Sequence, residues 1–328
     1  MEDKNLKGHA ALLAAYLIFG LNTPISKVVL MQGGTSALAL TFYRFAGATA
    51  LFWIASLFIA KERVKLRDLR QLFLASIIGI FVNQLPFIIG LSLTSPINAS
   101  VITTSSPILT MLLAAFFLKE PITWKKVVGV LTGAAGALLL IFGGTPVDHD
   151  KSAGITGDLL CVLSCASFSV YLAAFKQLIT RYSPVSSMKW MFLFATLCSL
   201  PFCWRDVIAV DYGAMPSDVY LQIAYVVGMA TFVSYLLVPV GQKRLRPTIV
   251  SMYNYLQPLV SSLIALALGM DAFGWTKGMA SLLVFLGVYI VIQSKSRAQM
   301  ESEKRQSTSS LNCSVENSVK DRKRFVLF

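Results

Sequence analysis

Charged residues are scarce in this sequence. Of its 328 residues, 14% are charged and 55% are hydrophobic, whereas a soluble globular chain usually carries about 25% charged residues. The mean hydropathy of +0.67 agrees with this. So few polar side chains cannot cover the surface of a soluble domain of this length. The composition therefore argues against a soluble enzyme, a disordered regulator and a secreted disulfide scaffold, and favours a chain that folds in lipid.

Residues typical of metal and catalytic sites are also few. The two histidines, His9 and His149, have no metal-ligand partner at i+4, and the five cysteines show no zinc-binding or disulfide-framework spacing. The sequence contains no phosphate-binding loop, zinc-protease helix or nucleophile elbow. We therefore expect no metal, no cofactor and no enzymatic activity.

Long apolar runs recur along the chain. A membrane-spanning helix needs about 20 mostly apolar residues, and residues 71–118 include no charged residue at all. The spans must be helical, because lipid offers no partner to unpaired backbone groups. We predict an all-α membrane protein with ten transmembrane helices. Their expected limits are Gly8–Met31, Ser36–Ala60, Arg70–Leu93, Pro96–Leu118, Trp124–Phe142, Ile155–Thr180, Val185–Trp204, Asp218–Gln242, Pro247–Leu268 and Gly274–Gln293.

The positive charges in the loops predict the orientation. Cytoplasmic loops of membrane proteins normally carry the excess of Lys and Arg. If the N-terminus is cytoplasmic, the outside loops hold only Lys151, Arg205 and Lys277. The inside loops then hold Lys61, Arg63, Lys65, Arg67, Arg70, Lys119, Lys125, Lys126, Arg181, Lys243, Arg244 and Arg246. We therefore predict that both termini are cytoplasmic.

The second half of the chain repeats the first. A shift of 151 residues places Pro107 on Pro258 and Trp124 on Trp275, and a shift of 149 places Gly8 on Gly157. Because each copy has five spans, an odd number, the second copy must enter the membrane from the opposite side. Such inverted repeats typically serve alternating access, in which two halves rock around one central site.

This repeat also gives the domain boundaries. We predict a cytoplasmic N-terminus at 1–7, a first five-helix repeat at 8–142, a periplasmic linker at 143–154 and a second repeat at 155–293. Residues 294–328 form a polar, Ser-rich tail, which we expect to be cytoplasmic and disordered.

Short motifs in both halves resemble the drug/metabolite transporter superfamily, in its EamA-like branch of ten-span permeases. The first copy carries Phe19-Gly20 with Lys27, Phe42-Tyr43-Arg44-Phe45, Ala99 to Pro107 and Leu118-Lys119-Glu120-Pro121-Ile122; the second carries Tyr253-Asn254-Tyr255-Leu256-Gln257-Pro258 and Leu268-Gly269-Met270-Asp271. The family usually has Glu where Asp271 stands. The resemblance implies export or exchange of small metabolites, often amino acids, across a bacterial inner membrane.

Polar residues recur at helical spacing inside two equivalent spans. The fourth span contains Ser100, Thr103, Ser106 and Thr110, and the ninth contains Ser251, Asn254, Gln257 and Ser261 at the matching positions. Polar groups at membrane depth are candidates for a binding site, although Ser and Thr also hold helices together. We predict a cavity lined by the first, third, fourth, sixth, eighth and ninth spans.

The predicted substrate-binding residues extend these polar stripes across the repeat. They are Asn22, Arg44, Asn83, Gln84, Thr103, Ser106, Tyr171, Ser234, Tyr235, Tyr253, Asn254, Tyr255 and Gln257. Pro107 and Pro258 lie beside the stripes, where proline removes a backbone donor and can kink the helix.

Arg44 is the most unusual charge in the spans. Lys27, Lys176 and Lys189 lie near span ends, where a lysine can extend to the interface. Arg44 lies about eight residues into its span, roughly 12 Å deep at 1.5 Å per residue. It therefore needs a carboxylate, backbone carbonyls or water as a partner, and a substrate carboxylate is one candidate.

All sixteen acidic residues lie in loops, in the tail or at span ends. A proton or sodium relay, or a site for a cation, normally needs a carboxylate inside the membrane. We therefore expect neutral, zwitterionic or anionic solutes, with amino acids as the leading class and outward transport. Proton coupling would need Asp158, His9 or Glu120.

Three alternatives stay open at this stage. A nucleotide-sugar or organophosphate exchanger would use Lys27, Arg44 and Lys176 as anion ligands. A lipid-processing membrane enzyme or scaffold and a gated pore are the others. The expected partners are a small-molecule substrate and the lipid bilayer, without nucleic acid, and the expected assembly is a monomer or a weak homodimer.

Overall fold

The structure is a computed structural model of the 328-residue chain, and it describes residues 2–32, 34–93, 102–142, 155–213, 215–257, 259–260 and 275–294. These residues form helices and short connections, with no strand among them. The helices are α1 (Glu2–Gln32), α2 (Ala37–Leu57), α3 (Leu66–Ser76), α4 (Val82–Leu93), α6 (Ser106–Leu118), α7 (Trp124–Phe142), α8 (Ile155–Ala174), α9 (Lys176–Arg181), α10 (Pro184–Ala209), α11 (Ser217–Tyr225), α12 (Ser234–Arg244), α13 (Pro247–Met252) and α15 (Trp275–Ile292).

Six helical stretches of the described chain are long and apolar enough to cross a bilayer. They are Asn5–Leu30, Ala37–Leu57, Leu66–Leu93, Ile155–Ala174, Pro184–Ala209 and Ser217–Arg244, and Ser106–Leu118 and Gly278–Ile292 are shorter apolar helices. Large apolar side chains such as Phe116, Ile155 and Trp275 are mostly exposed, as expected where the surface faces lipid. The chain is thus built as a multi-pass membrane protein. The count of ten spans stays a prediction, because 94–101 and 261–274 lie outside the described residues.

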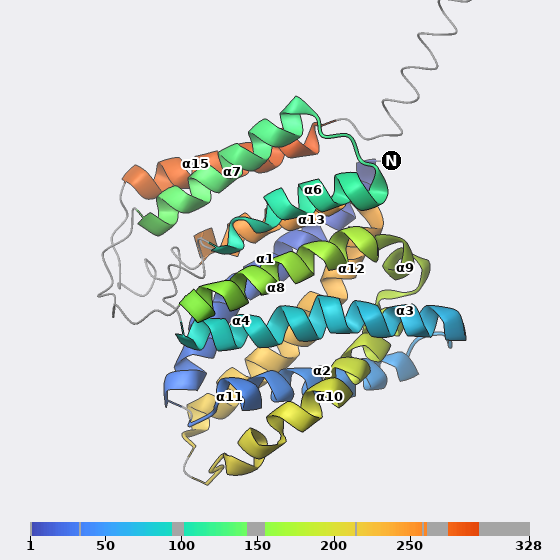
Figure 1. The fold of residues 1–328 in the computed structure, drawn as a ribbon, viewed down its shortest axis with the longest axis vertical. Helices are drawn as coiled ribbons and strands as arrows, with labels where there is room; N and C mark the ends of the chain where they lie inside the picture. Colours follow the sequence, from blue (N-terminus) through green and yellow to red (C-terminus); the bar gives the residue numbers. More distant parts are fainter. Residues whose placement is uncertain are drawn as a thin grey trace, which may run out of the picture.

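The helices pair across the two repeats. In Figure 1, α7 and α15 lie together at one edge of the bundle, and α2 and α10 lie near the opposite edge. Between them, α1 packs along α12 and α8 packs along α4. Exchanging the two repeats converts the α1–α12 pair into the α8–α4 pair and leaves the two outer pairs unchanged. The helix pairing is therefore the same when the two repeats are exchanged.

Two spans carry π-helical segments at equivalent places. Ile77–Phe81 joins α3 to α4, and Val226–Val233 joins α11 to α12. A shift of 151 residues places the first segment inside the second. A π-helical turn leaves out regular i to i+4 hydrogen bonds, and such turns are frequent at functional sites. In the second segment, the Thr231 hydroxyl donates to the Val226 carbonyl at 2.7 Å, which fixes its side chain toward the bundle interior.

The loops predicted to be cytoplasmic meet at one end of the bundle. Asp68 at the start of α3 accepts hydrogen bonds from Arg181 at 2.8 Å and from Tyr182 at 2.6 Å. The Glu62 carboxylate accepts from the Ser183 backbone amide at 2.9 Å. Partial burial opposes ionisation of Glu62, but the hydrogen bonds from Ser183 and Ser186, together with the charge of Lys243, hold the pKa of Glu62 below its usual value. These contacts join the first repeat to the second.

Candidate functional site

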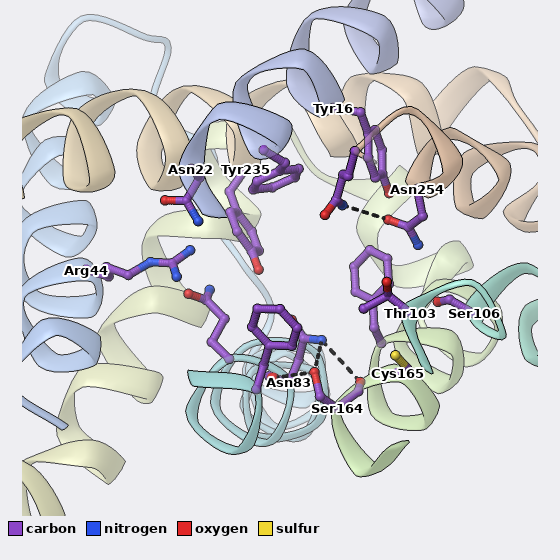
Figure 2. Close-up of a pocket in the computed structure, with 15 residues that line it drawn as sticks. Tyr16, Asn22, Arg44, Asn83, Thr103, Ser106, Ser164, Cys165, Tyr235 and Asn254 are labelled. Carbon is purple, nitrogen blue, oxygen red and sulfur yellow. Dashed lines mark hydrogen bonds between the residues drawn. The ribbon is translucent and has the colours of Figure 1, made fainter. Parts of the chain in front are cut away.

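A pocket of about 730 Å³ of space not filled by protein atoms lies at the centre of the bundle (Figure 2). Its walls come from α1, α2, α4, α6, α8 and α12, from the connection before α6 and from the chain after α13. The lining residues are Tyr16, Phe19, Asn22, Arg44, Asn83, Gln84, Phe87, Thr103, Ser106, Ser164, Cys165, Phe168, Tyr235, Asn254 and Gln257. The first, third, fourth, sixth, eighth and ninth spans, which were expected to line a cavity, all contribute residues to this pocket. The second span, which was not expected there, contributes Arg44.

Most of the predicted site residues line this pocket. Those that do are Asn22, Arg44, Asn83, Gln84, Thr103, Ser106, Tyr235, Asn254 and Gln257. Three pairs among them are related by the repeat shift of 151: Thr103 with Asn254, Ser106 with Gln257, and Gln84 with Tyr235. Equivalent positions of the two halves therefore face the same space.

Tyr171 and Ser234 do not line the pocket, although the sequence placed them there. The Tyr171 ring packs against Gly79 of the first π-helical segment, and its hydroxyl donates to Gln242 at 3.3 Å. Ser234 is fully buried, and its hydroxyl lies 3.4 Å from the Ala15 carbonyl of α1. Both side chains hold helices together instead of facing the pocket.

Tyr253 and Tyr255 also lie outside the pocket wall. The Tyr253 hydroxyl lies 2.8 Å from Nδ1 of His9. Tyr255 has no exposed surface, and its hydroxyl donates to the Thr104 carbonyl at 3.2 Å. A 3₁₀ turn at Tyr253–Tyr255 follows α13 and changes the direction of the side chains, so Asn254 faces the pocket while its two neighbours point away.

The polar stripes divide between the pocket and helix packing. Thr110 donates to Ser169 of α8 at 3.1 Å and so joins α6 to α8, whereas Ser251 is fully buried and donates to the Thr248 carbonyl of its own helix at 3.0 Å. Helix α6 begins at Ser106, directly after a turn at residues 104–105, and Pro107 lies in its first turn. The predicted kink at Pro258 and the stripe residues Ser100 and Ser261 lie outside the described residues.

Six lining residues were not among those predicted. They are Tyr16, Phe19, Phe87, Ser164, Cys165 and Phe168. The shift of 149 that relates the first and sixth spans places Tyr16 on Cys165 and Phe19 on Phe168. The repeat alone could therefore have located these two pairs once one member was assigned to the pocket.

Arg44 is the site's unusual electrostatic feature. Its side chain is 4% exposed, and its Nε donates to the Thr231 hydroxyl at 3.0 Å. No described carboxylate forms an ion pair with Arg44. The ion pairs among the described residues are Lys126–Glu120 and Arg181–Asp68. Figure 2 shows the guanidinium reaching into the pocket.

One buried amide and one buried hydroxyl in the pocket lack a partner among the described residues. Gln84 is 4% exposed, yet neither its Nε2 nor its Oε1 has a hydrogen-bond partner among the described residues, and the same holds for the Tyr16 hydroxyl. Gln257 donates to the Asn254 side-chain oxygen at 3.2 Å, which leaves the Gln257 oxygen available. Buried polar groups are normally hydrogen-bonded, so a polar solute or water is required here.

Asn83 is held in place from the neighbouring repeat. Its Nδ2 donates to the Ser164 carbonyl at 3.2 Å and to the Ser164 hydroxyl at 3.1 Å, and that hydroxyl donates back to the Asn83 carbonyl at 2.6 Å. These bonds tie α4 to α8 at the pocket wall. They leave the Asn83 side-chain oxygen as its remaining acceptor.

Comparison with known proteins gives consistent matches along the chain. A transporter of Archaeoglobus fulgidus is 28% identical over 79% of this chain and 90% of its own length. A WAT1-related protein of Arabidopsis thaliana is 30% identical over 84% of this chain and 75% of its own. An S-adenosylmethionine uptake transporter of Rickettsia felis is 25% identical over 57% of this chain and 59% of its own.

A solved structure supports the fold, and a family profile supports the assignment. The solved structure has a TM-score of 0.69 and is 20% identical, and the match covers 88% of this chain and 97% of that one. This likeness supports the fold alone. The profile of the EamA-like transporter family matches residues 6–142 and again residues 155–293. The chain therefore belongs to the EamA-like transporter family, within the drug/metabolite transporter superfamily.

Proposed function

We propose that this membrane transporter carries small polar metabolites by alternating access, with amino acids and similar zwitterionic or neutral solutes as its substrates and export as its direction. The observation that carries the proposal is the central pocket, in which the buried Gln84 amide and the buried Tyr16 hydroxyl lack a partner among the described residues. The proposed location is a bacterial inner membrane with both termini in the cytoplasm. Two of the relatives named above, those of Archaeoglobus fulgidus and Rickettsia felis, carry the name of transporters, which is consistent with a protein that performs no catalysis.

The construction of the pocket supports alternating access. Both repeats supply its walls through equivalent residues, such as Thr103 with Asn254 and Ser106 with Gln257. Two halves of inverted topology can exchange roles around such a site, so that each side of the membrane is reached in turn. In this scheme the bonds from Asp68 to Arg181 and Tyr182 hold the halves together at one end and must break when the pocket opens there.

The substrate class draws on the site and on one relative. The Rickettsia felis protein is named for uptake of S-adenosylmethionine, a metabolite that carries an α-amino acid group. In this chain, the lining residues offer neutral hydrogen-bonding groups together with aromatic rings such as Phe87 and Phe168. This mixture fits solutes with a polar head and an apolar side chain. Because that relative is named for uptake, the direction of transport needs its own measurement.

The double variant Asn254→Ala with Gln257→Ala should transport at least about tenfold more slowly at low solute concentration. Each lost hydrogen bond costs about 1 kcal/mol, and about 1.4 kcal/mol corresponds to a factor of ten. The measurement is transport of a panel of twenty radiolabelled amino acids in inside-out and right-side-out vesicles. Gln177→Ala is the matched control, because Gln177 is exposed on α9 and does not line the pocket.

The outcomes separate the function from the site. If wild-type protein moves none of these solutes in either direction, the proposed substrate class is wrong. If it moves one of them and the double variant keeps the wild-type rate and affinity, the assignment of Asn254 and Gln257 fails.

A further inference from the structure

A positive charge is buried at one side of the pocket without a counter-charge. Arg44 is 4% exposed, and no described carboxylate pairs with it. The described lining of the pocket contains no acidic residue. Burying an unpaired charge is costly, so a guanidinium that remains in such a site needs a ligand, water or both around it.

The protein fixes the orientation of this guanidinium while leaving its binding face unused. Thr231, held by its bond to the Val226 carbonyl, accepts the hydrogen bond from Nε. Nη1 and Nη2 donate no hydrogen bond to any described residue. These two groups form the planar fork that binds a carboxylate through two parallel hydrogen bonds.

Neighbouring side chains complete a polar end of the pocket. Figure 2 shows Arg44 on the same side as Asn22 and Tyr235, and Asn254 and Ser106 on the opposite side. Gln84 also lines the pocket, and its amide has no described partner. One end of the pocket is therefore positive, and the other is neutral.

The number of cations limits the kind of anion. Arg44 is the one cation in the described lining. Lys176 donates to the Leu245 carbonyl at 2.8 Å, and Lys189 lies over the Trp53 ring at 5.0 Å, so neither reaches the pocket; the side chain of Lys27 lies outside the described residues. A single guanidinium balances one carboxylate, whereas the pyrophosphate of a nucleotide sugar carries more negative charge than this site offsets.

We propose that Arg44 forms a carboxylate subsite, so that transported solutes carry one free carboxylate and bind with it directed toward α2. This inference rests on the proposed transport function and specifies its substrate class. The rest of the solute lies toward Asn254 and Gln257, with Phe87 and Phe168 as its apolar contacts. The pocket therefore selects for a carboxylate and fixes the direction in which the solute lies.

The test compares acids with amides of the same shape. The probes are L-phenylalanine with L-phenylalaninamide, and 3-phenylpropionate with 3-phenylpropionamide, measured by transport in proteoliposomes that contain the full chain. We expect wild-type protein to prefer each acid at least tenfold. Arg44→Gln should lose at least tenfold for the acids and little for the amides. Lys189→Gln, which removes a cation that contacts Trp53 outside the pocket, should keep the wild-type preference.

A second variant keeps the charge and removes only its anchor. Thr231→Val deletes the hydroxyl that accepts from Nε, so we expect a severalfold rise in KM for the acids and no change for the amides. If thermal unfolding shows that Arg44→Gln does not fold, Thr231→Val still tests the carboxylate subsite. Equal losses for acids and amides in both variants would mean that Arg44 is structural and would overturn the subsite.

Two further results are distinguishable from each other. If wild-type protein transports acid and amide equally well, transport stands and the carboxylate subsite is wrong. If it transports neither these probes nor any of the twenty amino acids, the proposed function fails, and the subsite fails with it.

Discussion

Gly287→Ala is expected to destabilise the protein strongly by forcing α7 and α15 apart. A Cβ at Gly287 would lie 2.5 Å from the Gly133 nitrogen, 2.6 Å from the Gly129 oxygen and 2.7 Å from the Gly133 Cα. These are backbone atoms, so no side-chain rotation relieves the clash. Overpacking of a tight contact costs about 1 to 3 kcal/mol, and we expect the upper part of that range. The measurement is thermal unfolding of the purified protein in detergent.

Gly228→Ala is the matched control for this prediction. It adds the same methyl group to a glycine in the second π-helical segment, where nothing lies within 4 Å of the new Cβ. We expect a change in the free energy of unfolding within about 0.5 kcal/mol. Equal melting temperatures for Gly287→Ala and Gly228→Ala would show that α7 and α15 do not approach so closely.

The contact between α7 and α15 was only partly predictable from the sequence. The shift of 151 residues also places Gly136 on Gly287. The apolar run predicts a span at Trp124–Phe142, which are the bounds of α7. The sequence did not say which helix would lie against these glycines. That depends on how the outer pair of helices docks, because small residues permit close approach without choosing the partner.

The regularity of the spans was overestimated. The sequence predicts helical spans with kinks at Pro107 and Pro258, but it does not predict the π-helical segments of two spans or the 3₁₀ segment at Tyr253–Tyr255 after α13. Apolar runs reveal length and hydropathy, whereas a local change of helical pitch follows from contacts made far along the chain. The third span also begins earlier than expected, at Leu66, where Asp68 in its first turn is bonded by Arg181 and Tyr182.

Polar pocket residues were easier to predict than apolar ones. Asn254 and Gln84 stand out because an amide inside a membrane span needs a reason. Phe19 and Phe168 were missed, because an aromatic ring at such a position is indistinguishable from one in the core. Tyr255 was assigned to the pocket because of its type, but the rotation of its backbone turns it toward Val130 and Thr104, where its hydroxyl is bonded. Residue type therefore indicates how deep in the membrane a residue lies better than it indicates where its side chain points.

Glu120→Gln is the second variant from which we expect a large effect. The Lys126 ammonium lies 2.7 Å from Oε2 of Glu120, and the two side chains are 1% and 11% exposed. Two more cations, Lys176 and Arg246, are close enough to interact with the same carboxylate. Burial lowers the pKa of Arg246, and the negative charge of Glu120 opposes that change. Removing the carboxylate therefore leaves a buried cluster of positive charge without compensation.

Removal of one partner of a buried ion pair typically costs about 3 to 5 kcal/mol, and we expect Glu120→Gln to fall in this range in thermal unfolding. Lys125→Met is the matched control, because Lys125 precedes Lys126 and is exposed, so its loss should change stability by less than about 0.5 kcal/mol. An effect of Glu120→Gln as small as that of the control would mean that the carboxylate does not neutralise this cluster.

A double-mutant cycle separates the pair from the rest of the cluster. Lys126→Met removes the buried ammonium and keeps a side chain of similar length, so Glu120→Gln combined with Lys126→Met should be more stable than Glu120→Gln alone. The interaction energy in such a cycle isolates the pair, provided that neither change creates new contacts. If the double variant regains only part of the loss, the remainder measures the repulsion between Lys176 and Arg246, which lose their shared counter-charge in both variants. No recovery at all would place the whole effect in these two residues and not in Lys126.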